Sequence, residues 1–384
     1  MIQRDFLPFN LGTTGIGSHP INDAEKIISD IFESGITYPY IPQLSTDEMT
    51  FQFHRSFPGL SIQNGVTVLD LNTPNFNESL REFKNLIEFK SLLFQPHGIA
   101  PEAKVLEPIS IFSELLHRAS NQPAGMKCQM VGPITEASSI KIHPGNAKLI
   151  QNSELFDLLI NFSMELAYWL SIYLLSIASS HQIPRSNVIL FIDEPLYPLA
   201  IENDLSPADA MDRIVRVLQF IQCKKGIHIC DNPLSVLDLI LKYPLDLFSF
   251  DAIRYPLSLK NTDQETLYNY IMRGGGFAFG LTPNTPETLF GVENLPAIMT
   301  GDLNPTDFLP SPDDLIRTLE ANIRPLEQKG IPIQQLLAQS LISPACGFRN
   351  FNIPTPDAGE LIVKQLLQIQ EQAAQKLRET YELI

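Results

Sequence analysis

Two residues that could share a metal ion stand at the end of a short apolar segment of this sequence. His228 and Cys230 are separated by one residue where the apolar run 226–229 ends. Residues two apart in a strand point to the same side, so this imidazole and this thiolate could bind one ion together. A core histidine beside a buried cysteine gives the same pattern, and an isolated H-x-C pair does not separate the two interpretations.

Cys346 supplies a third candidate ligand from a distant part of the chain, and Asp251 a fourth. Each stands at or just beyond the end of another short apolar run. Three nitrogen and sulfur ligands with one replaceable oxygen position are typical of a catalytic zinc site, whereas a structural zinc site is closed by four protein ligands. The sequence therefore predicts a catalytic zinc ion on His228, Cys230 and Cys346, with Asp251 as the candidate further ligand.

Two more polar residues have comparable positions. Asp193 follows the apolar run 188–192, where its carboxylate could bind an ammonium group or orient a base, although it could equally cap the following turn. Ser18 follows Gly15-Ile16-Gly17, and glycines let backbone N–H groups approach a carboxylate closely. An ordinary turn residue is the alternative for Ser18.

Positioning these residues requires a set of buried strands. Eight short apolar runs punctuated by Gly or Pro predict them, at 11–17, 36–41, 126–131, 188–192, 226–229, 247–250, 277–281 and 340–342. Helical patterns lie between the runs, at 23–34, 79–94, 153–180, 207–223, 233–242, 263–273, 312–328 and 358–381. This alternation predicts an α/β fold, a single (β/α)8 TIM barrel that spans residues 1–384.

The segment 45–125 is too long for one connection, so we expect an inserted lobe between strands 2 and 3. Its Phe-rich stretch 50–58 could form a lid or the packed core of that lobe. Barrels of this kind carry their active sites at the carboxyl ends of the strands. The polar clusters named above all lie there, and this shared position is stronger evidence than any single motif.

Charge and composition restrict the function. The net charge of −16 opposes binding to nucleic acid or to an anionic membrane surface, both of which require clustered Lys and Arg. No run of eighteen apolar residues occurs, and the N-terminus lacks the apolar core of a signal peptide. Four cysteines in 384 residues do not form a disulfide scaffold. We therefore expect a cytoplasmic protein with reduced thiols.

Eight stretches of the sequence together resemble a known family. They are TTGIGSHP (13–20), YIPQL (40–44), VGPIT (131–135), FIDEP (191–195), GIHIC (226–230), SFDA (249–252), GGGFAFGLTP (274–283) and SPACGF (343–348). In this order they resemble the C-terminal catalytic barrel of cobalamin-independent methionine synthase. They resemble still more its short single-barrel relatives in the uroporphyrinogen decarboxylase–methionine synthase superfamily.

The resemblance implies a role for each candidate residue. Zinc would bind His228, Cys230 and Cys346, and Asp251 lies about where the synthase has a Glu ligand. The resemblance also implies that the substrate amino acid is held through its carboxylate and its amine. Its binding residues would be Ile16, Gly17 and Ser18 for the carboxylate, Asp193 for the amine, and Gln43 near the position of a second amine-binding Glu.

Departures from the family concern the methyl donor. The N-terminal half of the synthase is absent, Thr282 stands where the synthase has a histidine, and no Trp follows GPIT. Methyl-folate is a poor donor unless its nitrogen is protonated, whereas a methyl-corrinoid leaves as cobalt(I) without a proton. We therefore expect methylcobalamin or a related methyl-corrinoid, free or carried on a partner corrinoid protein.

The predicted function is zinc-dependent transfer of a methyl group to a small-molecule thiol, homocysteine, to give methionine. One alternative is a corrinoid-protein-dependent methyltransferase to a thiol without an amine, such as coenzyme M. A non-catalytic protein that handles zinc or corrinoid is another. Porphyrinogen decarboxylation is disfavoured, because it needs an Arg-rich cavity. The N-terminal region does not provide one, since only Arg4 and Arg55 precede Arg81.

Overall fold

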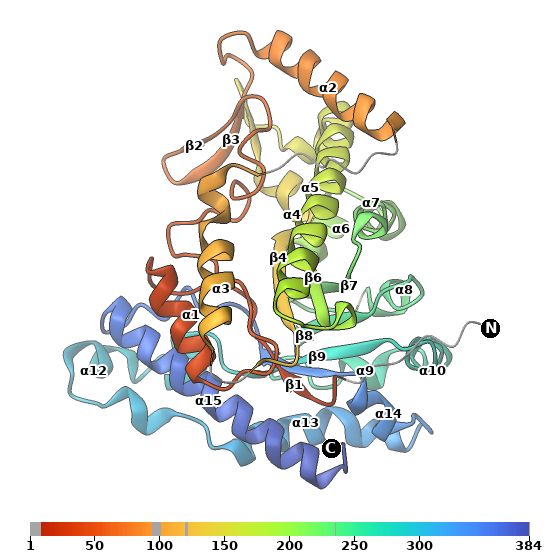
Figure 1. Ribbon diagram of the computed structural model, residues 1–384. Helices are drawn as coiled ribbons and strands as arrows, with labels where there is room; N and C mark the ends of the chain where they lie inside the picture. The colour runs from red at the N-terminus through yellow and green to blue at the C-terminus, as the bar shows by residue number, and fades with distance from the viewer. Residues whose placement is uncertain (1–8, 94–100, 120–121, 235, 384) are drawn as a thin grey trace.

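Seven of the predicted apolar runs form one parallel sheet in the computed structural model, which describes residues 9–93, 101–119, 122–234 and 236–383. The strands are rich in Val, Ile and Phe and are buried on both faces, as parallel strands covered by helices must be. Their order across the sheet is β1 (Gly12–Thr13), β10 (Leu341–Pro344), β9 (Gly276–Thr282), β8 (Leu247–Asp251), β7 (Lys224–Ile229), β6 (Val188–Asp193) and β4 (Met126–Val131). The sheet is curled, with helices around it (Figure 1).

The extended segment 37–41 connects the two edges of this sheet and takes the place of the second strand. Tyr38 N donates to Thr13 O of β1 at 2.8 Å, and Ile41 N donates to Lys127 O of β4 at 2.9 Å. Pro39 has no N–H to donate, so the pairing is reduced to single bridges such as Tyr40–Lys127. The predicted TIM-barrel fold is confirmed, with an irregular second strand.

Helices cover the outside of the barrel and complete its loops. The longer ones are α1 (Ala24–Glu33), α3 (Glu107–Arg118), α5 (Ser153–Ser180), α7 (Pro207–Phe220), α10 (Gln264–Met272), α13 (Pro312–Glu327) and α15 (Pro356–Thr380). The short α-helices are α4 (Pro133–Ser139), α6 (Tyr197–Asn203), α8 (Leu237–Ile240), α9 (Ser258–Asn261), α11 (Pro286–Phe290), α12 (Leu295–Thr300) and α14 (Ile333–Ala338). Single turns of 3-10 helix are labelled η1 (Ala103–Leu106), η2 (Leu149–Gln151), η3 (Arg185–Asn187) and η4 (Pro305–Phe308). The helix after the second strand was not predicted: it is α3, which packs beside α1.

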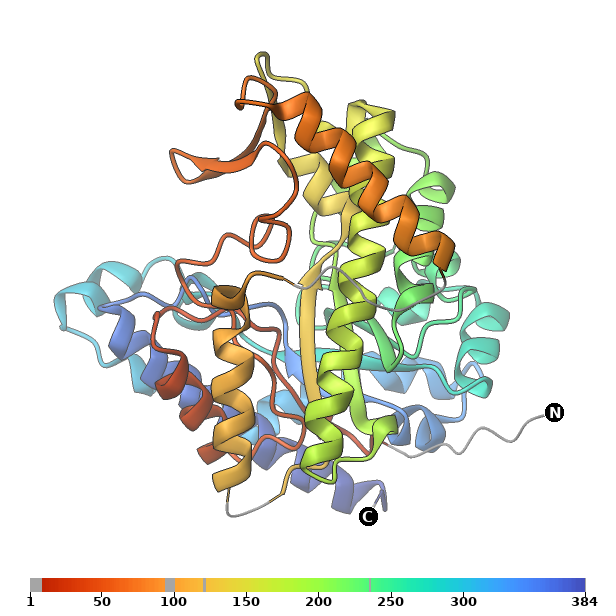
Figure 2. The same cartoon turned by 45° about the horizontal axis from the view of Figure 1, so that its top comes forward.

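A small second sheet forms a lobe at one end of the barrel. β2 (Leu60–Gln63) and β3 (Val66–Asp70) make a hairpin whose turn residues, Asn64 and Gly65, both have positive φ. β3 also pairs in parallel with β5 (Lys141–His143), so the lobe takes a strand from beyond β4. The predicted helix 79–94 coincides over 79–93 with α2 (Phe76–Leu93), which lies in this lobe rather than on the barrel wall (Figure 2), and residue 94 lies outside the described residues.

The Phe-rich stretch 50–58 packs as part of the core. Phe57 is 1% exposed, and its ring contacts those of Phe83 and Phe162 edge-to-face or tilted. Phe162 belongs to α5, the helix of the described residues that is long and apolar enough to cross a membrane. However, 61% of its most apolar window is buried, and α5 packs against α7, β6 and β4. We therefore interpret α5 as a core helix of the barrel; the cytoplasmic location stays a prediction.

The C-terminal helix α15 holds the Ser18 turn from outside the barrel. Glu360 lies 3.0 Å from His19 Nδ1, and His19 Nε2 lies 2.8 Å from the Tyr40 hydroxyl. All three side chains are buried. Because His19 follows Ser18 and Tyr40 lies in the second strand, this hydrogen-bonded chain connects α15 to the strand-end residues predicted to bind substrate.

Replacing Glu360 by Ala should therefore destabilise the protein by about 3 kcal/mol, because His19 would stay buried without its partner. The free energy of unfolding can be measured by urea titration with circular dichroism. Glu379→Ala, at an exposed position of the same helix, should change the free energy of unfolding by less than about 0.5 kcal/mol. Equal effects of the two substitutions would contradict this role of the Glu360–His19 pair.

Candidate metal centre

Three side chains from opposite parts of the barrel rim converge on one point. His228 is near the carboxyl end of β7, Cys230 directly follows β7, and Cys346 follows β10. Ligand atoms of the three residues all lie within 4.8 Å of one another. β8 and β9 separate β7 from β10 in the sheet, so the curvature of the barrel brings these residues together.

The orientation of His228 suits it to bind a metal ion. Its ring is 2% exposed, and Nδ1 lies 2.9 Å from Oγ of Ser249, the residue paired with it on β8. With the proton on Nδ1 donated to Ser249, the lone pair of Nε2 is free. Nε2 is buried and has no hydrogen-bond partner. An unsatisfied buried nitrogen is costly, and a second ring nitrogen fixed by a neighbour is the usual arrangement of a ligating histidine.

A hydrogen bond connects the two cysteines. It runs from the Cys230 thiol to the Cys346 sulfur and lowers the pKa of Cys346 well below its ordinary value. The pKa of Cys230 is raised, because its proton is held against the Cys346 sulfur and because it is buried. Of the two sulfurs, Cys346 is therefore the one that deprotonates more readily before any cation binds. These residues fit a soft divalent ion, whose binding would displace the remaining proton.

Asp251 lies outside this three-residue group. Its Oδ1 accepts hydrogen bonds from the backbone N–H groups of Ile253 at 3.0 Å and Arg254 at 2.8 Å. Burial raises the pKa of the Asp251 carboxyl above its ordinary value. In this structure Asp251 caps the turn after β8, and its role as a fourth ligand stays a prediction.

Asp193 ends β6, directly beside His228 in the register of the sheet. Its Oδ1 is buried without a hydrogen-bond partner, and burial raises its pKa to about 6. Its neighbour Glu194 caps the amino end of α4, in a different loop from the turn that follows β6. Glu194 accepts hydrogen bonds from Ile134 N at 3.0 Å and Thr135 N at 2.7 Å. Asp193 therefore keeps an oxygen available for a ligand.

The predicted carboxylate-binding turn lies next to Cys346. A Cβ added to Gly347 would lie 1.8 Å from Ser18 Oγ, so no larger residue fits between the turn and the cysteine loop. Ser18 pairs with Gln43 through a parallel bridge, and Gln43 Nε2 donates to Gln52 Oε1 at 2.9 Å. The structure thus brings Ser18 and Gln43 together at the rim.

The backbone of this turn has free donors. No hydrogen bond found among the described residues uses the N–H group of Ile16, Gly17 or Ser18. Gly17 has φ +127°, a conformation that side chains rarely adopt. Successive free N–H groups in such a turn form a concave site for an anion.

One buried residue at this site was missed in the sequence. Lys127, the second residue of β4, is 1% exposed and donates to Gly15 O at 2.8 Å and to Gln129 Oε1 at 3.0 Å. Its ammonium lies 5.0 Å from the centre of the Phe191 ring. A lysine inside an apolar run that predicts a buried strand was itself the signal, because lysine is almost never fully buried unless paired.

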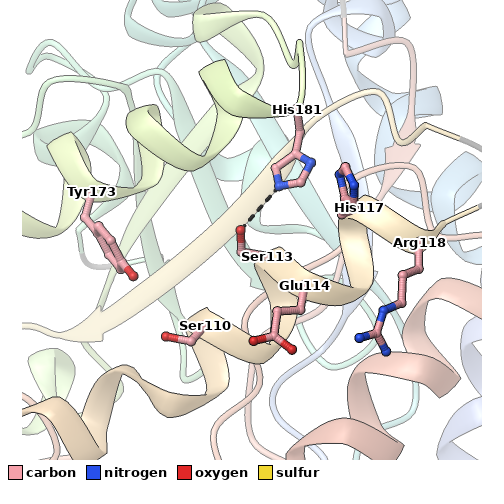
Figure 3. Close-up of a pocket in the computed structure, with 7 residues that line it drawn as sticks. All are labelled: Ser110, Ser113, Glu114, His117, Arg118, Tyr173 and His181. Carbon is pink, nitrogen blue, oxygen red and sulfur yellow. Dashed lines mark hydrogen bonds between the residues drawn. The ribbon is translucent and has the colours of Figure 1, made fainter.

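A separate groove lies on the outside of the barrel between α3 and α5 (Figure 3). Its volume is about 470 Å³, and its lining includes His117 and His181, whose rings meet edge-to-face. Both residues stand at the C-terminal ends of their helices, which lead into the amino ends of β4 and β6. The groove therefore lies toward the end of the barrel opposite the cysteine cluster.

Comparison with known proteins gives a likeness of fold. The sequence matches no protein-family model, and no curated protein is similar enough to match it. One similar structure is that of a B12-independent methionine synthase from Shewanella sp. W3-18-1 in complex with selenomethionine. The two sequences are 11% identical, and the match covers 97% of this chain and 99% of that chain with a TM-score of 0.58. A methyltransferase from Methanosarcina mazei is 12% identical, covering 96% and 94%, with a TM-score of 0.49. The first likeness confirms the predicted resemblance at the level of fold.

The lowered pKa of Cys346 predicts which thiol reacts first in metal-free protein. Brief treatment with iodoacetamide near pH 7 should label the Cys230–Cys346 pair first, because a thiol with a lowered pKa forms the reactive thiolate more readily. Cys128 and Cys223 should stay unlabelled until the protein unfolds, because burial raises the pKa of both thiols to about 12. Peptide mass spectrometry over a pH series measures the labelling. If all four cysteines were labelled in parallel, and only at alkaline pH, the hydrogen bond between Cys230 and Cys346 would be contradicted.

Proposed function

We propose that this protein is a zinc-dependent methyltransferase that methylates the thiol of homocysteine, giving methionine. The observation that carries the proposal is the cluster of His228, Cys230 and Cys346, whose ligand atoms lie within 4.8 Å of one another, with the buried oxygen of Asp193 one strand away. A ligand set of one imidazole and two thiolates is one that zinc prefers. The shared fold of a methionine synthase over nearly the whole chain supports the same reaction.

Each part of the rim has a role in this proposal. A zinc ion held there would supply the Lewis acidity that favours the thiolate form of a substrate thiol at neutral pH. Asp193 would hold the substrate's ammonium group by a charge-assisted hydrogen bond. The free N–H groups of Ile16, Gly17 and Ser18 would hold its carboxylate. With both ends fixed, the substrate sulfur is directed toward the methyl donor.

The transfer itself is a nucleophilic displacement at the methyl carbon. The new S–CH3 bond forms as the bond from carbon to cobalt or nitrogen breaks, and that electron pair leaves with the donor. The thiol proton passes to solvent. A nitrogen leaving group also needs a proton, whereas cobalt(I) does not.

The environment of Thr282 helps to distinguish between the possible methyl donors. Its hydroxyl is buried and donates to Gln370 Oε1 at 2.8 Å, so it faces α15 rather than a substrate. A hydroxyl so engaged is a poor proton donor for a folate nitrogen. We therefore propose a methyl-corrinoid as donor, free or on a partner protein. The structurally similar synthase is described as B12-independent, which makes the donor a direct object of experiment.

Replacing Cys346 by Ser should remove stoichiometric zinc and methyl transfer together, because a neutral hydroxyl is a poor substitute for a thiolate ligand. Metal content measured by mass spectrometry and an activity assay test this. Cys223→Ser is the matched control, since Cys223 precedes β7 at the other end of the barrel. Full zinc content in the Cys346 variant would show that the ligand assignment is wrong.

The donor and the acceptor can be tested in one assay of zinc-loaded protein. Methylcobalamin and methyl-tetrahydrofolate are each offered with homocysteine and, separately, with coenzyme M. We expect turnover with methylcobalamin and homocysteine only, since Asp193 has no partner on coenzyme M. Turnover with the folate would overturn the donor, and a preference for coenzyme M would overturn the acceptor. Zinc binding without turnover in any combination would favour a non-catalytic protein.

A further inference from the structure

Among the described residues, no carboxylate pairs directly with the buried charge of Lys127. Its ammonium donates to Gly15 O at 2.8 Å, to Ile16 O at 3.4 Å and to Gln129 Oε1 at 3.0 Å, all neutral oxygens. Burying a lysine costs free energy unless its charge is compensated. The anionic groups that interact with this charge include Asp193 and Cys346, both at the candidate site. The structure thus places a fixed positive charge beneath the rim.

The hydrogen bonds of Lys127 determine the orientation of the peptide groups in the turn next to it. Gly15 O and the N–H of Ile16 belong to one peptide unit, and Ile16 O and the N–H of Gly17 belong to the next. In a trans peptide the C=O and the N–H point in opposite directions. An ammonium that draws both carbonyls toward the barrel interior therefore turns both N–H groups away from it.

Gln129 makes this arrangement rigid. Its side chain accepts from Lys127 and donates from Nε2 to Ile41 O of the second strand at 2.8 Å. A Cβ on Gly17 would lie 2.5 Å from Gln129 Nε2, so the turn packs directly on this amide. The pair of side chains fixes the turn to β4 and to the segment 37–41 at once.

We infer that Lys127 is a positioning residue that makes the turn Ile16–Ser18 selective for thiols bearing a carboxylate. Its charge also polarises the two peptide units, so that their N–H ends bind an anion more strongly. This inference rests on the proposed function for the identity of the ligand, but it concerns binding and not methyl transfer. Burial lowers the pKa of Lys127 to about 8, so the ammonium form still predominates at neutral pH.

Equilibrium binding to zinc-loaded protein tests the inference. Homocysteine is compared by calorimetry with aminopropanethiol, which has the same thiol and amine but no carboxylate. Lys127→Met keeps the length of the side chain and removes its charge and donors. We expect it to weaken homocysteine binding about tenfold or more, with aminopropanethiol changed less than about twofold and zinc content unchanged. Lys127→Arg should restore part of the preference.

The controls separate this role from a general loss of structure. Ser340→Ala removes a buried hydroxyl that bonds Phe277 N and Leu336 O at the other end of the barrel, and it should leave the preference intact. If Lys127→Met does not fold, Lys127→Gln, which retains one donor, should show a partial loss of preference. Equal weakening of both thiols by either variant overturns the inference.

A wild-type protein without a preference for homocysteine over aminopropanethiol overturns it as well. If the wild type binds homocysteine with this preference but transfers no methyl group, the inference stands and the proposed function fails.

Discussion

Closure of the sheet by the segment 37–41 is the constraint on which the rest of the structure depends. β1 is only two residues long, and without this segment the sheet would be an open curl between β1 and β4. Tyr40 makes the closure specific, because its ring fills the space that a Cβ on Gly15 would occupy, 2.1 Å away. The curvature of this sheet brings the ends of β7 and β10, which β9 and β8 separate, to face each other across one rim. Closure by the segment 37–41 adds the turn 15–18 and Gln43 to the same rim.

Some polar side chains inside this barrel have hydrogen-bond partners, and others have none. Lys127 and Gln129 use their hydrogen-bonding groups on the backbone around them. At the rim, by contrast, His228 Nε2 and Asp193 Oδ1 are buried without partners. Native proteins retain such groups mainly where a ligand binds or chemistry occurs. His54 Nδ1 and Glu136 Oε1 of α4, 3.1 Å apart, form another buried pair. Burial lowers the pKa of His54 to about 3 and raises that of Glu136.

The sequence was sufficient for the barrel and for the meeting of the three candidate ligands His228, Cys230 and Cys346, because short apolar runs and strand-end positions are local patterns. It was insufficient where tertiary contacts decide. The helical pattern 79–94 is real, but its placement in the lobe instead of on the barrel wall depends on packing that no local period records. Asp251 has the expected position at a strand end, yet the two backbone N–H groups of the following turn hold its Oδ1. Lys127 was not singled out in the sequence because it lies within the run 126–131, which as a whole predicts a buried strand.

Under the proposed function, the charges of the site favour a zwitterionic thiol over an anionic one. A divalent cation would balance the thiolates of Cys230 and Cys346. An amino-acid thiol would add one charge of each sign, its ammonium toward Asp193 and its carboxylate toward the turn that Lys127 orients. A thiol with only a negative group would leave Asp193 buried and unpaired, at a cost of several kcal/mol. We therefore propose that selection among thiols at this rim depends on how charge is distributed along the substrate.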